Sequence, residues 1–492
     1  MMRSLFSGVS GLKVHQTKMD VIGNNIANVN TVGFKSSSVN FSDVFYQTTQ
    51  SASGPNAATG SAGRNAMQIG LGANVASITQ SITTQGASQR TDNPFDVMIQ
   101  GDGFFIVNSG GTNYFTKAGA FGVDAFGTLC TPTGATVMGW QVNDDGEIVR
   151  DTVSALQIMS PKNLYSEPEA TKAAYVSGNI DSIDTQLTSD VGKIVNISFY
   201  DKTGHSYTAD IKISRDESDP EGRYSVSITD IIDENNQSIF VKKTKDTDGK
   251  DIYVASDITE FTFGGYEFRV ATDGIDVETG EVTLESTGVP ILTFDSANGK
   301  FLRIVGTGDD GGTDDDNVNN ISLNINPTLS EEENLFSNIE IDFSSITHFA
   351  TNGTSNLTAV KGNLEGKDGG KRFGNMTGVS IDTAGKIYGK YDNGDSVLLG
   401  QLAVATFSNP AGLEAVGNNM FAATQNSGEF DGIGQDPTQG GGSLTTGVLE
   451  MSNVDLAAQF TEMITTQRGF QANSRIITTS DSMLEELINL KR

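Results

Sequence analysis

Two clusters of aspartate are the residues of this chain whose type and spacing come nearest to a metal site. One holds Asp246, Asp248 and Asp251 around Gly249, and the other occupies residues 309–316. Carboxylate oxygens on a flexible, glycine-rich backbone are ligands that calcium prefers. Neither cluster has the glutamate at the twelfth position of the common calcium loop. Solvated surface turns have the same composition, so we expect no metal and no cofactor, with calcium binding as the alternative.

The sequence offers no other residues arranged for catalysis. His15, His205 and His348 lie far apart, and none has an acidic or cysteine neighbour at metal-ligand spacing. A phosphate-binding glycine loop and a nucleophile elbow are both missing. Cys130 is the only cysteine, so no intramolecular disulfide can form, and burial is the default expectation for its thiol. We therefore predict no catalytic residue and no enzyme activity.

The strongest pattern is structural and lies at the two ends of the chain. Apolar residues recur there at every seventh position, which keeps one face of an α-helix turned toward a partner and is the coiled-coil condition. The pattern predicts one helix over about residues 3–29 and another over 450–492. The repeating residues are Leu5, Leu12, Met19 and Ile26 at the start, and Leu456, Met463, Phe470, Ile477 and Leu484 at the end.

The companion positions predicted for this seam are mixed in polarity. A polar residue in a helical seam costs stability but fixes register and partner. We expect the helices to become ordered when they pack against each other and against neighbouring copies. An antiparallel helix pair that closes one globular domain explains the repeat alone equally well. The companions are Val9, Gln16 and Gly23, and then Phe460, Gln467, Ser474, Asp481 and Ile488.

The residue strings at both ends are similar to those of a known family. The string DVIGNNIANVNTVGFK at residues 20–35 resembles the N-terminal signature of the bacterial flagellar rod and hook family. Residues 452–475 and 489–492 resemble the C-terminal signature of the same family. The stretches at 101–107 and 400–410 are similar to the hook members of this family. The distal rod members of the family are also much shorter than this chain. The resemblance covers the ends and their inner flanks and is weak in the middle of the chain.

The resemblance implies a structural subunit of the flagellar hook. Such subunits assemble helically into a curved homopolymeric tube outside the cell, which transmits torque from the basal-body rod to the filament as a universal joint. The implied partners are other copies of the chain, the rod, the hook cap, the hook–filament junction proteins and the type III export apparatus. The predicted polymer interface is Leu5, Leu12, Met19, Ile26, Leu456, Phe460, Met463, Phe470, Ile477 and Leu484. The alternatives are a distal rod protein of the basal body, or a secreted adhesin or enzyme that uses the ends as an assembly tag.

Charge is distributed in a way that suits assembly at the ends. The chain of 492 residues has a net charge of −29. Residues 1–45 hold four basic and two acidic groups, and residues 450–492 hold four basic and six acidic groups. Near-neutral ends avoid repulsion between stacked copies, and the acidic middle disfavours binding to nucleic acid. A generally acidic set of host proteins explains the charge equally well.

No membrane segment or signal peptide is expected. The sequence has no run of eighteen apolar residues that could span a bilayer, so we predict no membrane insertion. Arg3, Ser4, Ser7 and Gly8 interrupt the apolar pattern too early for the core of a signal peptide. Export would then follow the type III route that the resemblance implies. In some spirochaete members of the family a cysteine is joined to a lysine of a neighbouring subunit, and nothing in this sequence assigns that reaction to Cys130.

Between the ends the sequence predicts β structure. Residues 47–61 contain no charge and no large apolar side chain, which is typical of a linker; a disordered tether and an ordered arm are both open. Farther on, apolar residues alternate with polar ones at 207–213 and 224–228, as in half-buried strands. Gly264-Gly265 and Asn393-Gly394 are typical of hairpin turns.

The predicted fold class is therefore multidomain and mainly β, with α-helical coiled-coil N- and C-termini and nested β domains inserted between the terminal helices. Because the chain leaves one helix and returns to the other, the interior domains should nest. The predicted domains are 1–30 with 450–492 as the helical core, 31–69 as a linker or ordered arm, 70–150 with 350–449 as an inner β domain, and 151–349 as an outer β domain. Both a single outer domain and a subdivided one are open.

Overall fold

A computed structural model describes most of the chain. The described residues are 2–55, 60, 62–143, 146–215, 222–245, 250–305, 318–330, 332–439 and 442–490. Residues 246–249 and 309–316 fall outside these ranges, so the calcium hypotheses concern residues that are not described, except for Asp251, whose carboxylate lies 3.0 Å from Nζ of Lys243. Among the residues that are described, no three His, Cys, Asp or Glu side chains come together as metal ligands would.

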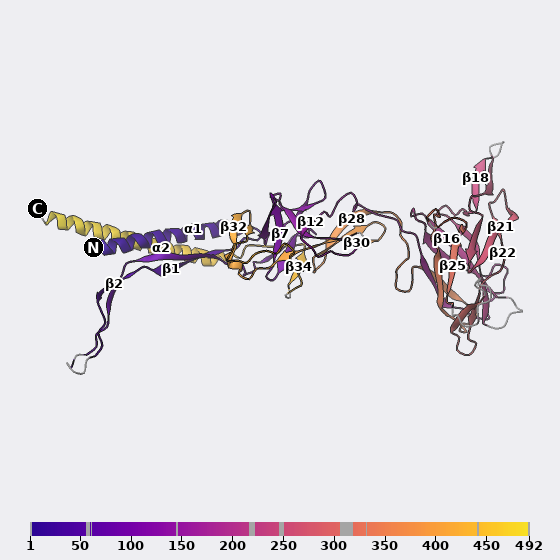
Figure 1. The fold of residues 1–492 in the computed structure, drawn as a ribbon, viewed down its shortest axis with the longest axis horizontal. Coiled ribbons are helices and arrows are strands. Elements are labelled where there is room, and N and C mark those ends of the chain that lie inside the picture. The colour runs from indigo at the N-terminus through magenta and orange to yellow at the C-terminus, as the bar shows by residue number, and fades with distance from the viewer. Residues whose placement is uncertain are drawn as a thin grey trace. The chain divides into compact units, whose positions relative to one another are not determined.

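The chain is mainly β, with one long helix near each end (Figure 1). It divides into two compact units: unit 1 is Met1–Leu164, Thr377–Lys390 and Ser396–Arg492, and unit 2 is Tyr165–Met376 and Tyr391–Asp395. The limits of unit 2 differ from the predicted 151 and 349. One reason is that β27 (Asn356–Lys361) extends a sheet of unit 2 by pairing with β14 (Ala173–Asn179). The division into four predicted domains stays a prediction.

The helical part of unit 1 consists of α1 (Met2–Ala27) and α2 (Leu456–Asn489), which lie side by side (Figure 1). Helix α2 begins at Leu456, the first residue of the predicted repeat, and β35 (Val448–Glu450) precedes it. Asp455 caps α2, since its side chain accepts hydrogen bonds from the backbone N–H groups of Ala457 at 2.9 Å and Ala458 at 3.2 Å.

Residues 37–80 form two strand pairs beside the helices. The strands β1 (Ser37–Asp43) and β4 (Ala73–Gln80) pair in antiparallel register and contact α1. The strands β2 (Tyr46–Gln50) and β3 (Met67–Gly70) continue outward as an arm (Figure 1). The described part of the predicted linker is therefore an ordered hairpin. Its residues 56–59 and 61 lie outside the described ranges.

The β part of unit 1 is built on one large sheet, which combines strands from residues 104–141 with strands from residues 374–422. Its hydrogen-bonded order is β28 (Gly374–Ile381), β29 (Lys386–Tyr391), β30 (Ser396–Leu402), β11 (Thr136–Gln141), β7 (Phe104–Ser109), β8 (Thr112–Thr116), β33 (Met420–Ala422) and β32 (Glu414–Gly417). Short strands flank this path: β9 (Gly122–Val123), β10 (Leu129–Cys130), β12 (Ser154–Ala155), β31 (Val404–Ala405) and, from unit 2, β13 (Tyr165–Ser166) at the start of β28. Two further pairs are β5 (Ser88–Arg90) with β35 and β6 (Val97–Gln100) with β34 (Ser443–Thr446).

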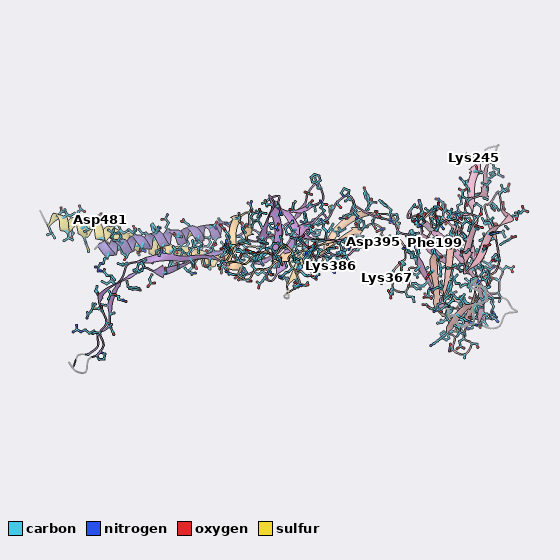
Figure 2. The ribbon with its side chains drawn as sticks, viewed as in Figure 1. Phe199, Lys245, Lys367, Lys386, Asp395 and Asp481 are labelled. Carbon is cyan, nitrogen blue, oxygen red and sulfur yellow. The ribbon has the colours of Figure 1, made fainter. Side chains whose placement is uncertain are left out.

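Unit 2 is built from two main sheets that share one apolar core. The first has the order β22 (Val282–Ser286), β21 (Tyr266–Ile275), β20 (Glu260–Phe263), β25 (Asn320–Ile325), β26 (Ile339–Thr347), β14 and β27. The second has the order β15 (Lys193–Tyr200), β16 (Ser206–Ser214), β17 (Arg223–Ile232), β23 (Ile291–Phe294) and β24 (Phe301–Val305), and β18 (Val241–Lys245) pairs with β19 (Asp251–Ala255). Buried residues of both sheets form a single cluster, which includes Phe199, labelled in Figure 2.

The predicted strands and turns of the middle are confirmed. The alternating residues at 207–213 and 224–228 lie in β16 and β17. Gly264 and Gly265 join β20 to β21 with φ of 59° and 81°, the positive values that a two-residue hairpin turn needs. The turn at Asn393 is longer than predicted: only Gly394 has a positive φ, and the Asn393 side chain accepts a hydrogen bond from the N–H of Asp395.

A candidate assembly interface on the terminal helices

Helices α1 and α2 run antiparallel and approach closely at glycines. Gly8 lies opposite Ile477, and Gly11 lies opposite Asn473. A Cβ added to Gly11 would lie 2.7 Å from Nδ2 of Asn473, and one added to Gly8 would lie 3.3 Å from Cγ1 of Ile477. Glycine inside a helix costs about 1 kcal/mol relative to alanine. Here its missing side chain makes room for the facing helix.

The same arrangement recurs with the roles of the helices exchanged. A Cβ added to Gly469 of α2 would lie 2.7 Å from the ring of His15 on α1. Nearer the start of α2, Lys18 faces Glu462 with 3.4 Å between Nζ and Oε2. This ion pair is half exposed, so it contributes at most about 1 kcal/mol. The pair is therefore assembled from glycine gaps and polar side chains as well as from apolar contacts.

The predicted companion positions are wrong on both helices. In the structure the buried and half-buried companions lie three residues after each predicted apolar residue, whereas the sequence interpretation placed them four residues after it on both helices. Thus Gly8, His15 and Ile22 accompany the seam on α1, and Gln459, Thr466, Asn473 and Ser480 accompany it on α2. Most predicted companions are exposed, including Asp481, which is labelled on α2 in Figure 2. A seven-residue repeat is compatible with either spacing. Most of the companions in the structure are not apolar, so hydrophobic periodicity does not identify them.

The ten predicted interface residues differ in how the subunit buries them. Eight are half-buried: Leu5, Leu12, Met19, Ile26, Met463, Phe470, Ile477 and Leu484. The other two, Leu456 and Phe460 in the first turns of α2, are 39% and 50% exposed. No member of the set is fully buried, so each retains apolar surface after the helices have paired.

Asn25 fixes the entry of the arm onto the helices. Its side chain accepts the backbone N–H of Ser37 at 3.0 Å and donates to the carbonyl of the same residue at 2.8 Å. It also donates to Oε1 of Gln459 on α2 at 3.1 Å. One buried amide thereby joins α1, β1 and α2, and its loss would leave several buried polar groups without partners.

His15 is a titratable group held between the helices. Its ring also meets Phe41 of β1 edge-on, with 6.1 Å between the ring centroids. Its Nδ1 is buried and has no hydrogen-bond partner among the described residues. Burial lowers the pKa of His15, and the nearby positive charge of Lys18 lowers it further.

Below the helices, an ion pair buried from solvent joins the two ends of the chain. Nζ of Lys35 lies 2.6 Å from Oε1 of Glu450, and each side chain is only 1% exposed. Lys35 also donates to the carbonyl of Thr84 at 2.7 Å, and Oε1 of Glu450 accepts the N–H of Gly86 at 2.9 Å. We call these four residues the polar joint. Removing one partner of such a buried pair costs about 3–5 kcal/mol.

Further polar contacts surround the polar joint. Asn453 accepts the N–H of Ser36 at 2.7 Å and donates to the carbonyl of Ser81 at 2.9 Å. Lys117 donates to the carbonyl of Gly101 at 3.0 Å. Burial lowers the pKa of Lys117 to about 8, although the negative charge of Glu450 opposes this shift. These contacts fix the segment that follows α1 to the segment that leads into α2.

Eight large hydrophobic side chains on α2 or directly after it stay exposed in the subunit. They fall in two groups along the chain, first Leu456, Phe460 and Ile464, and then Ile476, Met483, Leu487, Ile488 and Leu490. Exposed apolar patches on a soluble subunit mark interaction surfaces. We call this set the α2 stripe. Within the described residues, neither α1 nor α2 has the length and hydropathy that a membrane crossing requires.

Sequence reasoning missed the residues that carry most of the buried polar contacts. Lys35 and Asn453 lie in the terminal signatures, but no contact was predicted for them or for Glu450. Hydrophobic periodicity does not link polar residues that are so far apart in sequence. Cys130 was expected to be buried and is half-buried, and burial together with the charge of Asp124 raises the pKa of its thiol.

Comparison with known proteins gives family matches over the regions that contain these residues. Residues 5–35 match a family model described as flagella basal body rod protein, and residues 445–490 match flagellar basal body rod FlgEFG protein C-terminal. Residues 98–172 match flagellar hook protein FlgE/F/G D1 domain. The first of the two terminal matches covers α1 from residue 5 and ends at Lys35 of the polar joint. The second covers Glu450 of the polar joint and the whole of α2. These models are shared by hook and rod proteins and do not separate them.

Among full-length relatives the hook proteins below are more similar to the chain than the flagellar basal-body rod protein FlgG of Bacillus subtilis, which is 27% identical over 492 residues and covers 100% of both chains. The chain is 36% identical to the flagellar hook protein FlgE of Treponema pallidum over 505 residues, covering 100% of both chains. It is also 36% identical to FlgE of Borreliella burgdorferi over 502 residues, again covering 100% of both. The crystal structure of Helicobacter pylori FlgE2 matches at a TM-score of 0.36 and 14% identity, over 72% of this chain and 98% of that one, which adds no argument. The full-length identities show that the chain belongs to the flagellar hook protein family.

Proposed function

We propose that this chain polymerises with copies of itself into the curved hook tube, which connects the rod to the filament outside the cell and transmits torque as a universal joint. The observation that carries the proposal is the α2 stripe, because a single subunit leaves these apolar side chains in water. Covering an apolar surface returns about 25 cal/mol for each Å² removed from water. A neighbouring copy of the chain carries the same two helices and can cover these side chains with them.

The ten predicted residues keep a role in this proposal, divided in two. The eight half-buried ones set the position of α2 against α1, and Leu456 and Phe460 contact a neighbouring subunit directly. The near-neutral ends of the chain support close stacking. The rod, the hook cap, the junction proteins and the type III export apparatus are the further partners that this role requires. Membership of a structural family also supports a function without catalysis.

The substitution Phe460→Asp tests the proposal, because it places a charge on the α2 stripe where the free subunit is already exposed. We expect a folded subunit that fails to form tubes by negative-stain electron microscopy, and cells without hooks. Phe470→Asp changes another of the ten predicted interface residues. It should also abolish polymerisation and leave the β structure folded. Wild-type tubes from Phe460→Asp would contradict the assignment.

The matched control is Phe126→Asp, in a loop of unit 1 where the phenylalanine is 79% exposed. It introduces the same charge away from the helices and should leave assembly intact. The fluorescence of Trp140, the only tryptophan, reports whether unit 1 remains folded in each variant. Straight tubes from the unaltered chain would favour the distal-rod alternative, whereas curved tubes support the hook.

A further inference from the structure

Two aspartates face each other across neighbouring strands of unit 2. Asp210 on β16 and Asp230 on β17 are paired directly in antiparallel register, at a β-bulge that follows Asp210. Side chains placed in this way have their Cβ atoms about 4.5–5.5 Å apart, and like charges directly opposite destabilise a sheet. The flanking Ile211 and Ile231 are buried, and both aspartates are half-buried on the other face.

The two carboxyl groups differ in their hydrogen bonds. Oδ1 of Asp230 accepts from Oγ of Ser238 at 2.6 Å and from the N–H of Ile231 at 2.8 Å. Oδ1 of Asp210 is buried and has no partner among the described residues. A buried acceptor without a donor costs about 1–3 kcal/mol, and more when it is charged. Oδ1 of Asp210 therefore lacks a hydrogen-bond donor among the described residues.

No positive charge compensates the pair. On β15 the residue opposite Asp210 is the neutral Asn196. Lys212, two residues along β16, directs its amino group to the backbone carbonyl of Asp190. The turn after β17 adds only acidic groups, Asp233 and Glu234. Within the described part of the chain, neither Asp210 nor Asp230 forms an ion pair.

The titration of both groups is shifted in the direction that this geometry requires. Burial raises the pKa of Asp210. Burial also raises the pKa of Asp230, and the charge of Asp210 raises it further, against the hydrogen bonds from Ser238 and Ile231. Two interacting carboxyl groups titrate as a pair, so these shifts describe one shared site.

We propose that Asp210 and Asp230 share one proton taken from solvent, and that this proton strengthens unit 2 when the medium becomes acidic. The protonated carboxyl of one aspartate donates a hydrogen bond to the other, which supplies the missing donor and removes one of the two facing charges. The folded pair then binds protons more tightly than the unfolded chain, whose aspartates have a pKa of about 3.9. The stabilisation is complete below that value and is lost as the pH rises through the raised pKa of the pair.

Hydrogen exchange of the full-length chain tests this, using mass spectrometry of peptides from 206–232 with intrinsic rates corrected for pH. Between pH 4.5 and 7.5, the protection factor of the unaltered chain should fall about tenfold for every unit by which the pKa of the pair is raised. Asp210→Asn keeps the shape and supplies an amide donor to Asp230. Its protection should vary little with pH and should exceed that of the unaltered chain at pH 7.5.

The control is Asp181→Asn, also in unit 2. The carboxylate of Asp181 accepts the N–H groups of Thr351 and Gly353, which lower its pKa, so this change should reduce protection at neutral pH, the opposite sign. Protection of the unaltered chain that is constant from pH 4.5 to 7.5 would overturn the proposal, as would an Asp210→Asn variant with the original pH dependence. An increase in protection on adding calcium at pH 7.5, absent from Asp210→Asn, would show a cation in place of the shared proton.

Discussion

The helix pair of unit 1 and the β sandwich of unit 2 bury different kinds of side chain. The core of unit 2 is a continuous cluster of isoleucine, valine, leucine and aromatic residues from two sheets. The fully buried side chains of α2 are Thr466 and Ser480. A sandwich of this kind closes its apolar surface within one subunit. The helix pair closes little of it, and so it is suited to complete its packing with other chains.

The largest effect should come from opening the closed core. Phe343 lies in that core and is fully buried. Phe343→Ala should lower the free energy of unfolding of unit 2 by about 4 kcal/mol, through lost burial and the cavity left behind. Circular dichroism during denaturant unfolding would show this, whereas the Trp140 fluorescence transition should not move and tubes should still form. A shift of the Trp140 transition by the same amount would mean that the units are not independent.

Breaking the polar joint should come next. Lys35→Met leaves the buried Glu450 without its cation and should destabilise unit 1 by about 3 kcal/mol, measured by Trp140 fluorescence in denaturant. The double variant Lys35→Met/Glu450→Met should recover most of the loss, since a buried ion pair can be replaced by apolar residues at little cost. If both single and double variants lose the same stability, the joint acts through shape and not through charge.

Filling a glycine gap should weaken the helix pair by an intermediate amount. Gly11→Ala places a methyl group against Asn473, and overpacking of this kind costs about 2 kcal/mol even though alanine favours helix. Gly23→Ala on the same helix has nothing within 4 Å and should instead stabilise by up to about 1 kcal/mol. Hydrogen exchange of α1 amides in assembled tubes would separate the two. Equal protection in both variants would remove the close approach from the explanation.

Acid should weaken the helix pair slightly, the reverse of its proposed effect on unit 2. The pKa of His15 is lowered in the folded state, so the folded pair binds this proton less tightly than the unfolded chain, whose histidine titrates near 6.5. Its contribution is present above that value and declines as the pH falls below it. His15→Gln should flatten the pH dependence of α1 amide exchange, and His205→Gln in unit 2 should not. An unchanged profile in His15→Gln would assign the dependence to another group.

The sequence predicted the elements far better than their contacts. The seven-residue repeat located both helices, and alternation located β16 and β17, because each pattern reflects a period imposed by the backbone itself. The heptad companions were misplaced because glycine, histidine and asparagine carry no apolar signal, although Gly8 and Asn473 lie against the facing helix. Lys35 and Glu450 were beyond prediction for another reason: only the folded chain brings residues so distant in sequence together.

The predicted limits of the outer domain differ from those of unit 2 for a related reason, although the division itself stays a prediction. Strand β27 lies after the long insertion in sequence yet pairs with β14 near its beginning, and short exposed strands give little periodicity from which to assign them. The sequence also could not single out Asp210 and Asp230. Only the register of β16 and β17 places these two aspartates opposite each other.

The antiparallel course of α1 and α2 has a practical consequence for labelling. Residues near 2 and near 490 emerge at the same end of the helix pair (Figure 1). A fluorescent protein or affinity tag attached to either terminus would therefore crowd the same spot beside the α2 stripe. Reporters for imaging living cells are better inserted in an exposed hairpin of unit 2, such as residues 276–281 between β21 and β22.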